Sequence, residues 1–491
     1  MTNIFVMWYS IHTAVKYEER EANQETMTVA DLLQNEYQSW EKGIYLVNAP
    51  TGTGKTQFVL NQLYDYAQSN NKKIAMFVNR TILREQLLEN LQSKDIFIAT
   101  YQKLEFNNYL QKINYSMPLT YDLEDLNSKI NEFDYLILDE AHYLFQDSPF
   151  NPDTDVIMEL IEQFEGIVLM MSATPQILKR FYRDRITKEY EISTNYNYID
   201  RIITFDDDKE LQEIIAEIPL NEKILYFGGD KAKLQKYRDN FENSDYVSSD
   251  NKITNKSAKQ IIETNRFDCR ILFATKVLDN GVSIIDESLK HIFIDLDDLI
   301  TVIQCLGRKR IMGKEKINLY VRRKNKANFL PKWQELRKQM EVYRDYYSGM
   351  SLELFADKYR RRELPYFIDT KLQIIRPAEF FFLQRYSFVK SIMEGNITFM
   401  YELMGILHRY YPQPYKNIKR RRFLYENLEK PFYKEDKETL IQMLNFRKDG
   451  KLIRQLSTLN DCLKEKGFPY QLVSQIDCQR SSAKFKKTYW E

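Results

Sequence analysis

The sequence predicts an α/β protein with two parallel-sheet domains in tandem, followed by a mainly helical, basic C-terminal region. Over residues 40–325, short apolar runs alternate with stretches of helical periodicity, the pattern of strands whose sheet is covered by helices on both faces. The alternation begins twice, near residue 44 and near residue 201. A chain of 491 residues is also too long for a single hydrophobic core.

The predicted first domain spans residues 1–195. Its first strand, at 44–49, leads into a glycine-rich segment, and the spacing of the apolar residues that follow predicts a helix over 55–68. Further strands are predicted at 74–78, 96–99, 135–138 and 167–171, with a helix at 81–91.

The predicted second domain spans residues 196–325. A polar and aromatic segment without periodicity, residues 186–200, is the candidate linker between the two domains. Apolar runs predict strands at 224–227, 246–247, 270–273, 291–294 and 317–321.

The predicted accessory region spans residues 326–491. It has few glycines and favours helices, for example at 330–347 and 377–393, and residues 467–490 are compatible with a hairpin that closes a small winged-helix unit. The overall net charge of +1 hides an asymmetry: residues 1–300 carry a net charge of −18 (31 basic against 49 acidic residues), whereas residues 301–491 carry +19 (40 against 21). Basic C-terminal surface indicates either a polyanionic partner or a solubilising face, and charge alone does not separate the two.

Composition narrows the class of protein. The sequence contains no run of about 18 apolar residues, so no membrane span is expected. The N-terminal residues lack the features of a secretory signal. The cysteines show no metal-ligand spacing and are expected to be free thiols, although Cys462 and Cys478 are able to pair: Cys269, Cys305, Cys462, Cys478. A reducing cytoplasmic location is therefore expected.

A phosphate-binding loop is predicted at residues 49–56, which read Ala-Pro-Thr-Gly-Thr-Gly-Lys-Thr. Such a loop cradles nucleotide phosphates with its backbone N–H groups, so Gly52, Thr53 and Gly54 are candidate nucleotide contacts. Lys55 would reach the outer phosphates, and the hydroxyl of Thr56 would bind Mg²⁺. The first position of the motif is Ala rather than Gly, but the strand before the loop and the helix after it support the interpretation.

An acidic pair follows a predicted strand end. Asp139 and Glu140 come directly after the apolar run 135–138, where a carboxylate is able to hold the metal and a second one to orient the attacking water. His142 is expected to hydrogen-bond across to the next strand end, where Ser172 and Thr174 lie. Together with the loop, this pair predicts Mg²⁺-dependent hydrolysis of a nucleoside triphosphate.

At this point the sequence resembles superfamily 2 helicases and translocases of the DEAH-like branch, over about residues 40–325. Residues 49–56, 139–142 and 172–174 are similar to motifs I, II and III. Residues 273–284 are similar to motif V, and 304–310 to motif VI. The resemblance implies two RecA-like P-loop NTPase domains that hold ATP between them.

The resemblance also implies roles for residues of the second domain. Arg308 and Arg310 would stabilise the transferring phosphoryl group, with Gln304 near the nucleotide and with Asp279 and Gly281 of motif V contacting it. The usual pattern has its two arginines three positions apart, whereas here they are two apart, as in Dicer-like helicase domains. Which arginine contacts the γ-phosphate is left open.

Nucleic-acid contacts are implied more weakly. Segments around Phe77–Arg80 and Ala99–Leu104 resemble motif Ia and the strand end that follows it. In the family, Arg80, Thr100 and Thr275 would contact backbone phosphates, which position a strand without reading its sequence; a helix cap or a surface role is the alternative for Arg80 and Thr100. No aromatic–Gln element of DEAD-box RNA helicases precedes the loop, which argues against that subtype.

The C-terminal basic clusters have the composition of a single-strand path, because aromatic residues are interleaved with them. For the triple Phe380–Phe382 a core role is favoured. The clusters are Arg322–Lys324, Arg360–Arg362, Lys419–Arg422, and Lys484 with Lys486 and Lys487; the aromatics are Tyr343, Tyr346, Tyr347, Tyr359, Phe380, Phe381, Phe382, Tyr410 and Tyr411.

The expected function is an ATP-dependent helicase or translocase, with DNA favoured over RNA as its track. The chain shows no nuclease signature of its own, so a nuclease partner is possible. The alternatives are an RNA helicase, and an ATP-gated module that binds or senses nucleic acid without separating strands.

Overall fold

The computed structural model describes residues 2–8, 27–79, 96–101, 129–193, 195–278, 282–359, 364–369, 371–408, 412–427, 432 and 436–476. The chain forms two compact units. The larger consists of Gln24–Arg201 and Ala216–Tyr411, and the smaller of Met1–Asn23, Ile202–Ile215 and Pro412–Glu491.

A six-stranded sheet forms the centre of the first domain. Its strand order is β4-β3-β5-β6-β2-β7, and every pairing in it is parallel. The strands are β2 (Gly43–Asn48), β3 (Ile74–Val78), β4 (Ile96–Thr100), β5 (Tyr135–Asp139), β6 (Ile167–Ser172) and β7 (Ile186–Glu191). Because the strands are parallel, their carboxyl ends share one edge, where the phosphate loop follows β2 and the acidic pair follows β5.

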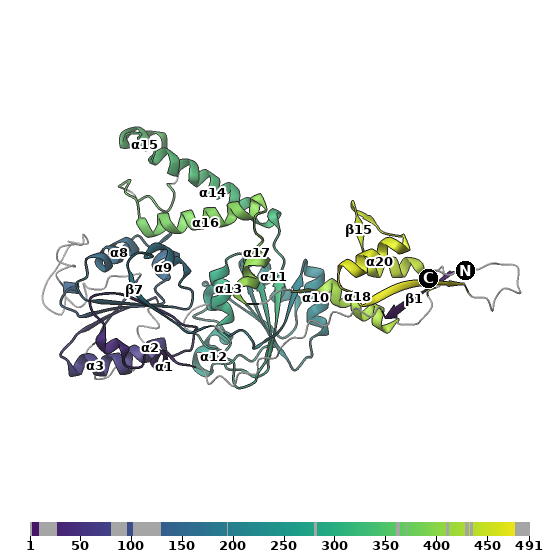
Figure 1. The fold of residues 1–491 in the computed structure, drawn as a ribbon, viewed down its shortest axis with the longest axis horizontal. Helices are drawn as coiled ribbons and strands as arrows, with labels where there is room; N and C mark the ends of the chain where they lie inside the picture. Colours follow the sequence, from purple (N-terminus) through teal and green to yellow (C-terminus); the bar gives the residue numbers. More distant parts are fainter. Residues whose placement is uncertain are drawn as a thin grey trace, which may run out of the picture. The chain divides into compact units, whose positions relative to one another are not determined.

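Helices cover both faces of this sheet, as Figure 1 shows. One face packs on α1 (Val29–Leu33) and on the helix that follows the phosphate loop, and the other on α7 (Tyr143–Gln146), α8 (Asp153–Gln163) and α9 (Gln176–Phe181). The helix after the loop is continuous from 55 to 69, as predicted: α2 (Lys55–Phe58), a π-helical turn (Val59–Leu63) and α3 (Tyr64–Ser69). A short 3₁₀ turn, Glu36–Ser39, precedes β2.

The predicted linker 186–200 is wrong over its first part. Residues 186–191 form β7, which pairs with β2 in parallel at the edge of the sheet. The strand was missed because most of its side chains are exposed or half-buried, with only Tyr190 buried, so it lacks an apolar run.

A second sheet has the order β10-β11-β9-β12-β13-β8-β14, in which β10–β11, β11–β9, β9–β12, β12–β13 and β8–β14 pair in parallel. The two parallel-sheet α/β domains of the prediction are thus confirmed. The strands are β8 (Ile199–Phe205), β9 (Lys223–Gly228), β10 (Ser244–Val247), β11 (Ile271–Ala274), β12 (Leu289–Asp295), β13 (Ile317–Arg322) and β14 (Gln413–Pro414). The helices are α10 (Asp208–Glu217), α11 (Lys231–Asn240), α12 (Lys256–Thr264), a 3₁₀ turn (Lys276–Leu278) and α13 (Leu299–Leu306).

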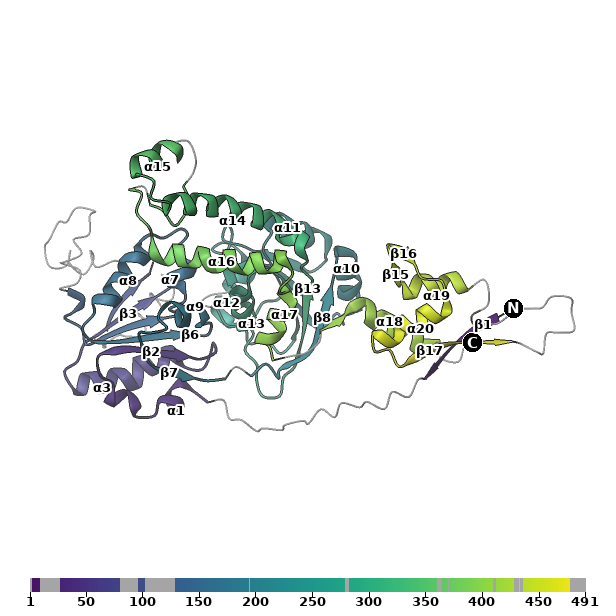
Figure 2. The same cartoon turned by 45° about the horizontal axis from the view of Figure 1, so that its top comes forward.

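The helical region after β13 begins with a long hairpin. Its two arms, α14 (Lys326–Tyr346) and α16 (Arg376–Glu394), lie side by side in Figures 1 and 2, with the shorter α15 (Leu352–Tyr359) between them in sequence and α17 (Phe399–Ile406) after them. These bounds agree with the helices predicted at 330–347 and 377–393. The arm α16 packs on α7 and α8 of the first domain.

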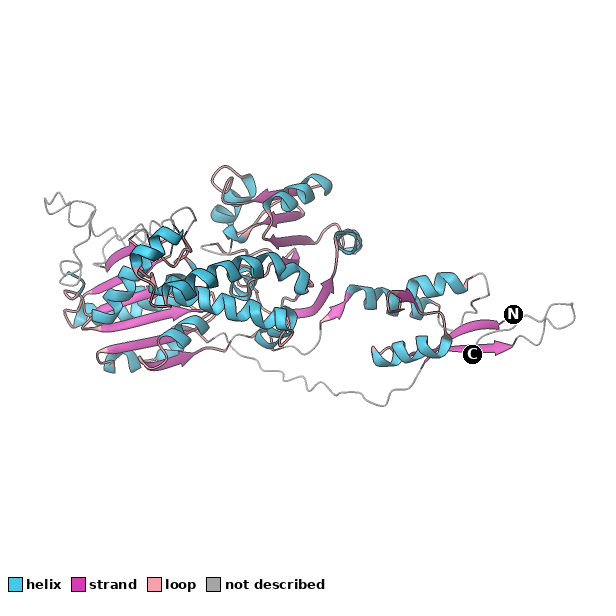
Figure 3. Cartoon of the chain, turned by 90° about the horizontal axis from the view of Figure 1, so that it is seen from above, coloured by secondary structure: helices cyan, strands magenta, loops and turns pink. Residues whose placement is uncertain are grey.

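The smaller compact unit joins the two ends of the chain. Strand β17 (Tyr470–Ile476) pairs antiparallel with β1 (Thr2–Trp8) instead of starting the predicted terminal hairpin, whose second half lies outside the described residues. The other elements of this unit, visible in Figure 3, are α18 (Tyr415–Glu426), α19 (Lys437–Leu444), the pair β15 (Arg447–Lys448) and β16 (Lys451–Leu452), and α20 (Leu456–Glu465). Within the described part of the chain, no helix is both long and apolar enough to cross a membrane.

Candidate nucleotide site

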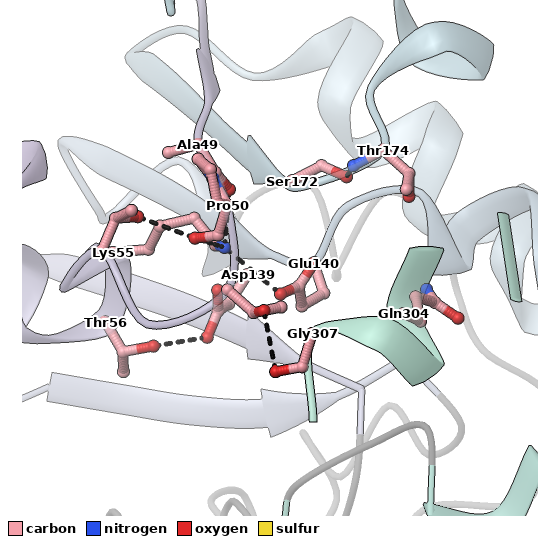
Figure 4. Close-up of polar contacts among 12 residues, drawn as sticks. Ala49, Pro50, Lys55, Thr56, Asp139, Glu140, Ser172, Thr174, Gln304 and Gly307 are labelled. Carbon is pink, nitrogen blue, oxygen red and sulfur yellow. Dashed lines mark hydrogen bonds and ion pairs between the residues drawn. The ribbon is translucent and has the colours of Figure 1, made fainter. Parts of the chain in front are cut away.

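The loop between β2 and α2 folds around the side chain of Lys55. Gly52 and Gly54 have φ angles of 89° and 79°, a left-handed conformation that glycine adopts without steric cost. The ammonium of Lys55 donates to the carbonyl oxygens of Ala49 (2.9 Å) and Pro50 (3.2 Å), as Figure 4 shows. The loop therefore presents a buried cation next to backbone that only glycine permits, which is the arrangement a phosphate group fits.

The acidic pair lies directly beside this loop. The hydroxyl of Thr56 donates to Oδ2 of Asp139 at 2.9 Å, and Oε1 of Glu140 lies 3.4 Å from the Lys55 ammonium (Figure 4). Glu140 has a φ of 50°, a left-handed conformation that non-glycine residues seldom adopt and that clusters at functional sites. The sequence thus placed both carboxylates correctly at a strand end, but it gave no sign of the strained backbone between them.

The charges of this pair fit a divalent cation. Burial, together with the charge of Glu140, raises the pKa of Asp139 to about 6, against the opposing influence of Lys55 and Thr56. For Glu140, burial also opposes ionisation, but the charges of Lys55 and Arg308 outweigh it and lower the pKa. A cation bound at Asp139 would relieve the repulsion between the two carboxylates.

The donor set suits Mg²⁺ rather than a metal held by protein alone. Among the described residues, no group of three or more His, Cys, Asp or Glu side chains is placed to hold a metal ion. Mg²⁺ is usually bound through one or two protein oxygens, with water and phosphate oxygens completing its shell. The hydroxyl of Thr56 and the carboxylate of Asp139 are oxygens of this kind.

His142 connects the acidic pair to the neighbouring strand and to the second domain. Its Nδ1 lies 2.8 Å from the hydroxyl of Ser172, and its Nε2 lies 2.5 Å from the side-chain nitrogen of Gln304. The backbone N–H of Thr174 donates to the same Ser172 oxygen at 2.9 Å. Burial lowers the pKa of His142 to about 4, so the ring is neutral at pH 7: Nδ1–H donates to Ser172, and Nε2 accepts from Gln304.

The second domain meets the phosphate loop through its motif VI segment. The hydroxyl of Thr51 donates to the carbonyl of Gly307 at 3.2 Å (Figure 4). A Cβ placed on Gly52 would lie only 2.5 Å from a terminal nitrogen of Arg310, so this guanidinium rests directly against the loop. The sequence analysis predicted neither contact, although Thr51 lies in the phosphate loop and Gly307 in motif VI.

The two arginines have different surroundings. Arg308 is buried and donates to the carbonyls of Gln304 (3.0 Å) and Val282 (3.2 Å), whereas Arg310 donates from Nε to the hydroxyl of Ser283 (3.0 Å) and has one terminal nitrogen close to Gly52. Burial and the charge of Arg308 lower the pKa of Arg310 to about 10, so it stays protonated at pH 7. Arg310 is the arginine whose head group faces the loop.

The remaining predicted site residues have three different positions. Thr100 and Thr275 are buried at the carboxyl ends of β4 and β11. Arg80, Asp279 and Gly281 lie outside the described residues. Thr53, in the loop, donates its hydroxyl to the carbonyl of Pro50 at 2.7 Å and is half-buried.

Part of the predicted basic strand path is wrong. Arg322 and Lys324 form ion pairs with Asp295. Burial acts to raise the pKa of this carboxyl, but the charges of the neighbouring cations outweigh burial and lower the pKa to about 2. Arg420 is buried and donates to the carbonyls of Leu444 and Asn445. These cations are paired with acceptors at strand and helix ends within the protein. Composition alone does not reveal such pairing.

Several of the interleaved aromatic side chains are buried in the protein, although Tyr347 is 54% exposed. Phe382 is fully buried and contacts Phe367 and Tyr343, while Phe380 and Phe381 pack on the first domain, which agrees with the core role favoured for this triple. Arg360–Arg362, Tyr410, Tyr411, Lys484, Lys486 and Lys487 lie outside the described residues. Cys269, Cys305 and Cys462 are free thiols, and Cys478 lies outside the described part.

One comparison with known protein families covers this part of the chain. Residues 16–177, which include the phosphate loop, the acidic pair and Ser172, match a family model described as "Type III restriction enzyme, res subunit". A search of curated proteins gave no match. The match covers only part of the chain and lies within the first of the two parallel-sheet domains.

Solved structures with a partial likeness are those of DEAD-box proteins. A variant of Dbp5 from S. cerevisiae bound to RNA and ADP BeF3 is 15% identical, with 57% of this chain and 79% of that chain covered and a TM-score of 0.39. Unsubstituted Dbp5 with the same ligands is 14% identical (62% and 79% covered, TM-score 0.36). A DEAD box protein from Methanococcus jannaschii is 16% identical (62% and 87% covered, TM-score 0.33). At these TM-scores the likenesses carry no argument about function.

Proposed function

We propose that the protein is an ATP-driven motor that moves along or unwinds DNA, of the DEAH-like branch of superfamily 2. The proposal rests mainly on one observation: residues of the first domain and an arginine of the second domain lie at the same phosphate loop. The first domain brings Lys55, Thr56, Asp139 and Glu140 together, and the second domain lays Arg310 against Gly52 of the same loop. A site completed by two domains is able to turn nucleotide hydrolysis into relative domain movement.

Each side chain has a defined task in this proposal. Lys55 and the loop N–H groups bind the phosphates, and Thr56 with Asp139 holds Mg²⁺, which neutralises charge on the phosphates when bound. Glu140 keeps its carboxylate ionised at neutral pH because the charges of Lys55 and Arg308 offset its burial, so it accepts a hydrogen bond from the attacking water and orients it. Arg310 stabilises the negative charge that spreads over the transferring group, a contribution of about 10³–10⁵ in rate for such arginines.

His142 and Gln304 give the two domains a direct polar link beside the reacting group. Their contact joins a residue two positions after the acidic pair to the helix α13, in which motif VI begins. Because the neutral His142 ring accepts from Gln304 while it donates to Ser172, a shift of α13 disturbs all three groups together. In this proposal, opening of the site after hydrolysis breaks the link and moves the second domain along the strand.

The choice of DNA follows from the sequence and is favoured by the family match. The chain shows no aromatic–Gln element before the loop, and residues 16–177 match a model named for a restriction enzyme, a class that cleaves DNA. Such a subunit would act with a nuclease partner. Free thiols at the three described cysteines fit the reducing cytoplasm.

Steady-state ATPase activity with single-stranded DNA, duplex DNA and single-stranded RNA, each at two salt concentrations, tests the proposal. Strong, salt-sensitive stimulation by one form of DNA is expected, because phosphate contacts release counterions. Stimulation by RNA alone would replace DNA with RNA as the track. ATP turnover that ignores every nucleic acid, or a Glu140→Gln variant that hydrolyses ATP at the wild-type rate, would overturn the motor or the site, respectively.

A further inference from the structure

A buried tyrosine lies behind the acidic pair and has no part in the site as described so far. Tyr101 follows the last residue of β4, and its side chain is fully buried within the core between the sheet and helices α7–α9. Its hydroxyl donates to the backbone carbonyl of Asp139 at 3.0 Å. Burial, with the charges of Asp139 and Glu140, raises the pKa of Tyr101 well above its usual value, so the hydroxyl keeps its proton as a donor.

This hydrogen bond grips the peptide that joins the two catalytic carboxylates. Glu140 adopts a φ of 50°, a conformation with a steric cost for any residue with a Cβ, which persists only where neighbouring contacts enforce it. On one side of Glu140, the Tyr101 hydroxyl holds the carbonyl of Asp139. On the other side, the N–H of Ala141 donates to the carbonyl of Met171 at 2.9 Å. The unusual turn is therefore held at both of its flanking peptides.

The tyrosine is itself fixed from several directions. Its backbone N–H donates to Val78 at 3.1 Å, its carbonyl accepts from the buried amide of Asn151 at 2.6 Å, and its ring stacks on Phe77 with a centroid separation of 6.2 Å. A side chain held this firmly is able to transmit a constraint to the group that it touches. Because Tyr101 directly follows Thr100, the same residue joins the carboxyl end of β4 to the metal-binding end of β5.

We propose that Tyr101 is a positioning residue that holds the Asp139–Glu140 peptide in its left-handed turn and so aims the Glu140 carboxylate at the attacking water. This inference rests on the proposed function, in which Glu140 orients that water. Tyr101 touches no reacting group and acts only through the peptide. Its loss should therefore slow turnover while leaving nucleotide binding by Lys55 and the loop intact.

The test compares two Tyr→Phe substitutions that each remove one buried hydroxyl from the same core. Tyr101→Phe removes the hydrogen bond to Asp139, whereas Tyr182→Phe is the matched control, because the Tyr182 hydroxyl is also buried in this core and has no hydrogen-bond partner in the described part of the chain. For Tyr101→Phe we expect kcat to fall about tenfold, which corresponds to ~1.4 kcal/mol in the barrier, with KM for ATP unchanged. Tyr182→Phe should match the wild type in both constants.

Glu140→Gln, measured in parallel, separates failure of this inference from failure of the proposed function. If Glu140→Gln abolishes turnover while Tyr101→Phe behaves like Tyr182→Phe, Tyr101 has no positioning role and the proposed function stands. If Tyr101→Phe raises KM and leaves kcat unchanged, the hydroxyl supports nucleotide binding and the inference is wrong. If Glu140→Gln turns over ATP normally, the proposed function and the inference fall together.

Discussion

The guanidinium of Arg310 occupies the space that a Cβ on Gly52 would need. The two would approach to 2.5 Å, so a larger residue would displace the guanidinium, and the φ of 89° at Gly52 favours glycine at this position. The contact brings a protonated side chain of the second domain to the loop that receives the phosphates. It distinguishes Arg310 from Arg308, whose donors are taken up by the carbonyls of Gln304 and Val282.

We predict that Arg310 is the arginine that acts on the transferring phosphoryl group. Arg310→Ala should lower kcat by a factor on the order of 10³ while nucleotide affinity changes little, because the charge matters most in the transition state. Arg310→Lys should recover little of the loss, since a lysine does not reproduce the planar, multiply donating head group. Single-turnover ATP hydrolysis with a separate nucleotide titration checks both statements.

Arg308→Ala is the matched comparison for that prediction. It removes a buried guanidinium that holds the turn after α13, so it should lower the free energy of unfolding by about 1–3 kcal/mol. Arg310→Ala should leave unfolding nearly unchanged. The assignment would be reversed by an Arg308 variant that folds normally and loses turnover while the Arg310 variant keeps it.

Asp139→Asn should make the nucleotide-free protein more stable at pH 7 while abolishing Mg²⁺-dependent turnover. Burial raises the pKa of Asp139 from 3.8 to about 6, so the folded state disfavours the charged carboxylate at neutral pH. An amide of the same shape removes that penalty and still accepts the Thr56 hydrogen bond. The gain in the free energy of unfolding should be about 1–3 kcal/mol, measured by chemical denaturation without Mg²⁺ or nucleotide.

The pH dependence of the gain in the free energy of unfolding of Asp139→Asn tests whether the buried carboxylate causes it. Because the pKa of Asp139 is raised in the folded state, the folded protein binds the proton more tightly, and stability falls as pH rises from about 4 to about 6. The lowered pKa of His142 acts in the opposite sense over the same range, but it is common to both proteins and cancels in the difference. The advantage of Asp139→Asn should therefore vanish below about pH 4; a gain that persists there would have another origin.

Much of this site was predictable because its candidate residues lie in short consecutive segments of the sequence. A loop such as 49–56 and an acidic pair after an apolar run each need only local sequence, and parallel strands bring their carboxyl ends to one edge without further information. Most strands of the two sheets, though not β7, β8 or β14, were predicted for a similar reason: strands buried on both faces read as continuous apolar runs.

The features that the sequence did not reveal depend on partners distant in the chain. Arg322 looks like surface charge until Asp295 is seen beside it, and β7 looks like a linker because only one of its faces meets the core. The antiparallel pairing of β1 with β17 joins residues at opposite ends of the chain, which no local pattern announces. The role inferred for Tyr101 depends on a hydrogen bond to a residue 38 positions away.

His142 and Gln304 should prove energetically coupled in nucleic-acid-stimulated ATP hydrolysis. Each single substitution to Ala breaks the same 2.5 Å contact, so the double variant should be less impaired than the sum of the two single effects. We expect a coupling of about 0.5–3 kcal/mol in the activation free energy of the stimulated reaction, the usual range for residues in contact. Four proteins assayed side by side give the cycle, and strict additivity would show that the contact does not connect the two domains during turnover.

The helix α16 should hold to the first domain mainly through its aromatic residues rather than its ion pairs. Phe380 packs on Phe145 of α7 and on Phe181 of α9, with ring centroids 5.7 and 5.1 Å away, whereas Arg376 makes half-exposed ion pairs with Asp155 and Glu162. Phe380→Ala should cost about 1–3 kcal/mol, less than a fully buried phenylalanine, and Arg376→Ala only ~0.2–1 kcal/mol.

Hydrogen exchange across residues 376–394 and 143–146 measures this docking more directly than global unfolding, because a multidomain chain need not unfold in one step. Phe380→Ala should speed exchange in both segments, and Arg376→Ala should do so weakly. Tyr401→Ala is the control, since that ring on α17 is 73% exposed and its removal should leave both segments unchanged. Faster exchange in Arg376→Ala than in Phe380→Ala would show that charge, and not packing, holds α16 in place. Because α7 begins one residue after His142, loosening of α16 should also lower ATP turnover in proportion to the exchange of α7.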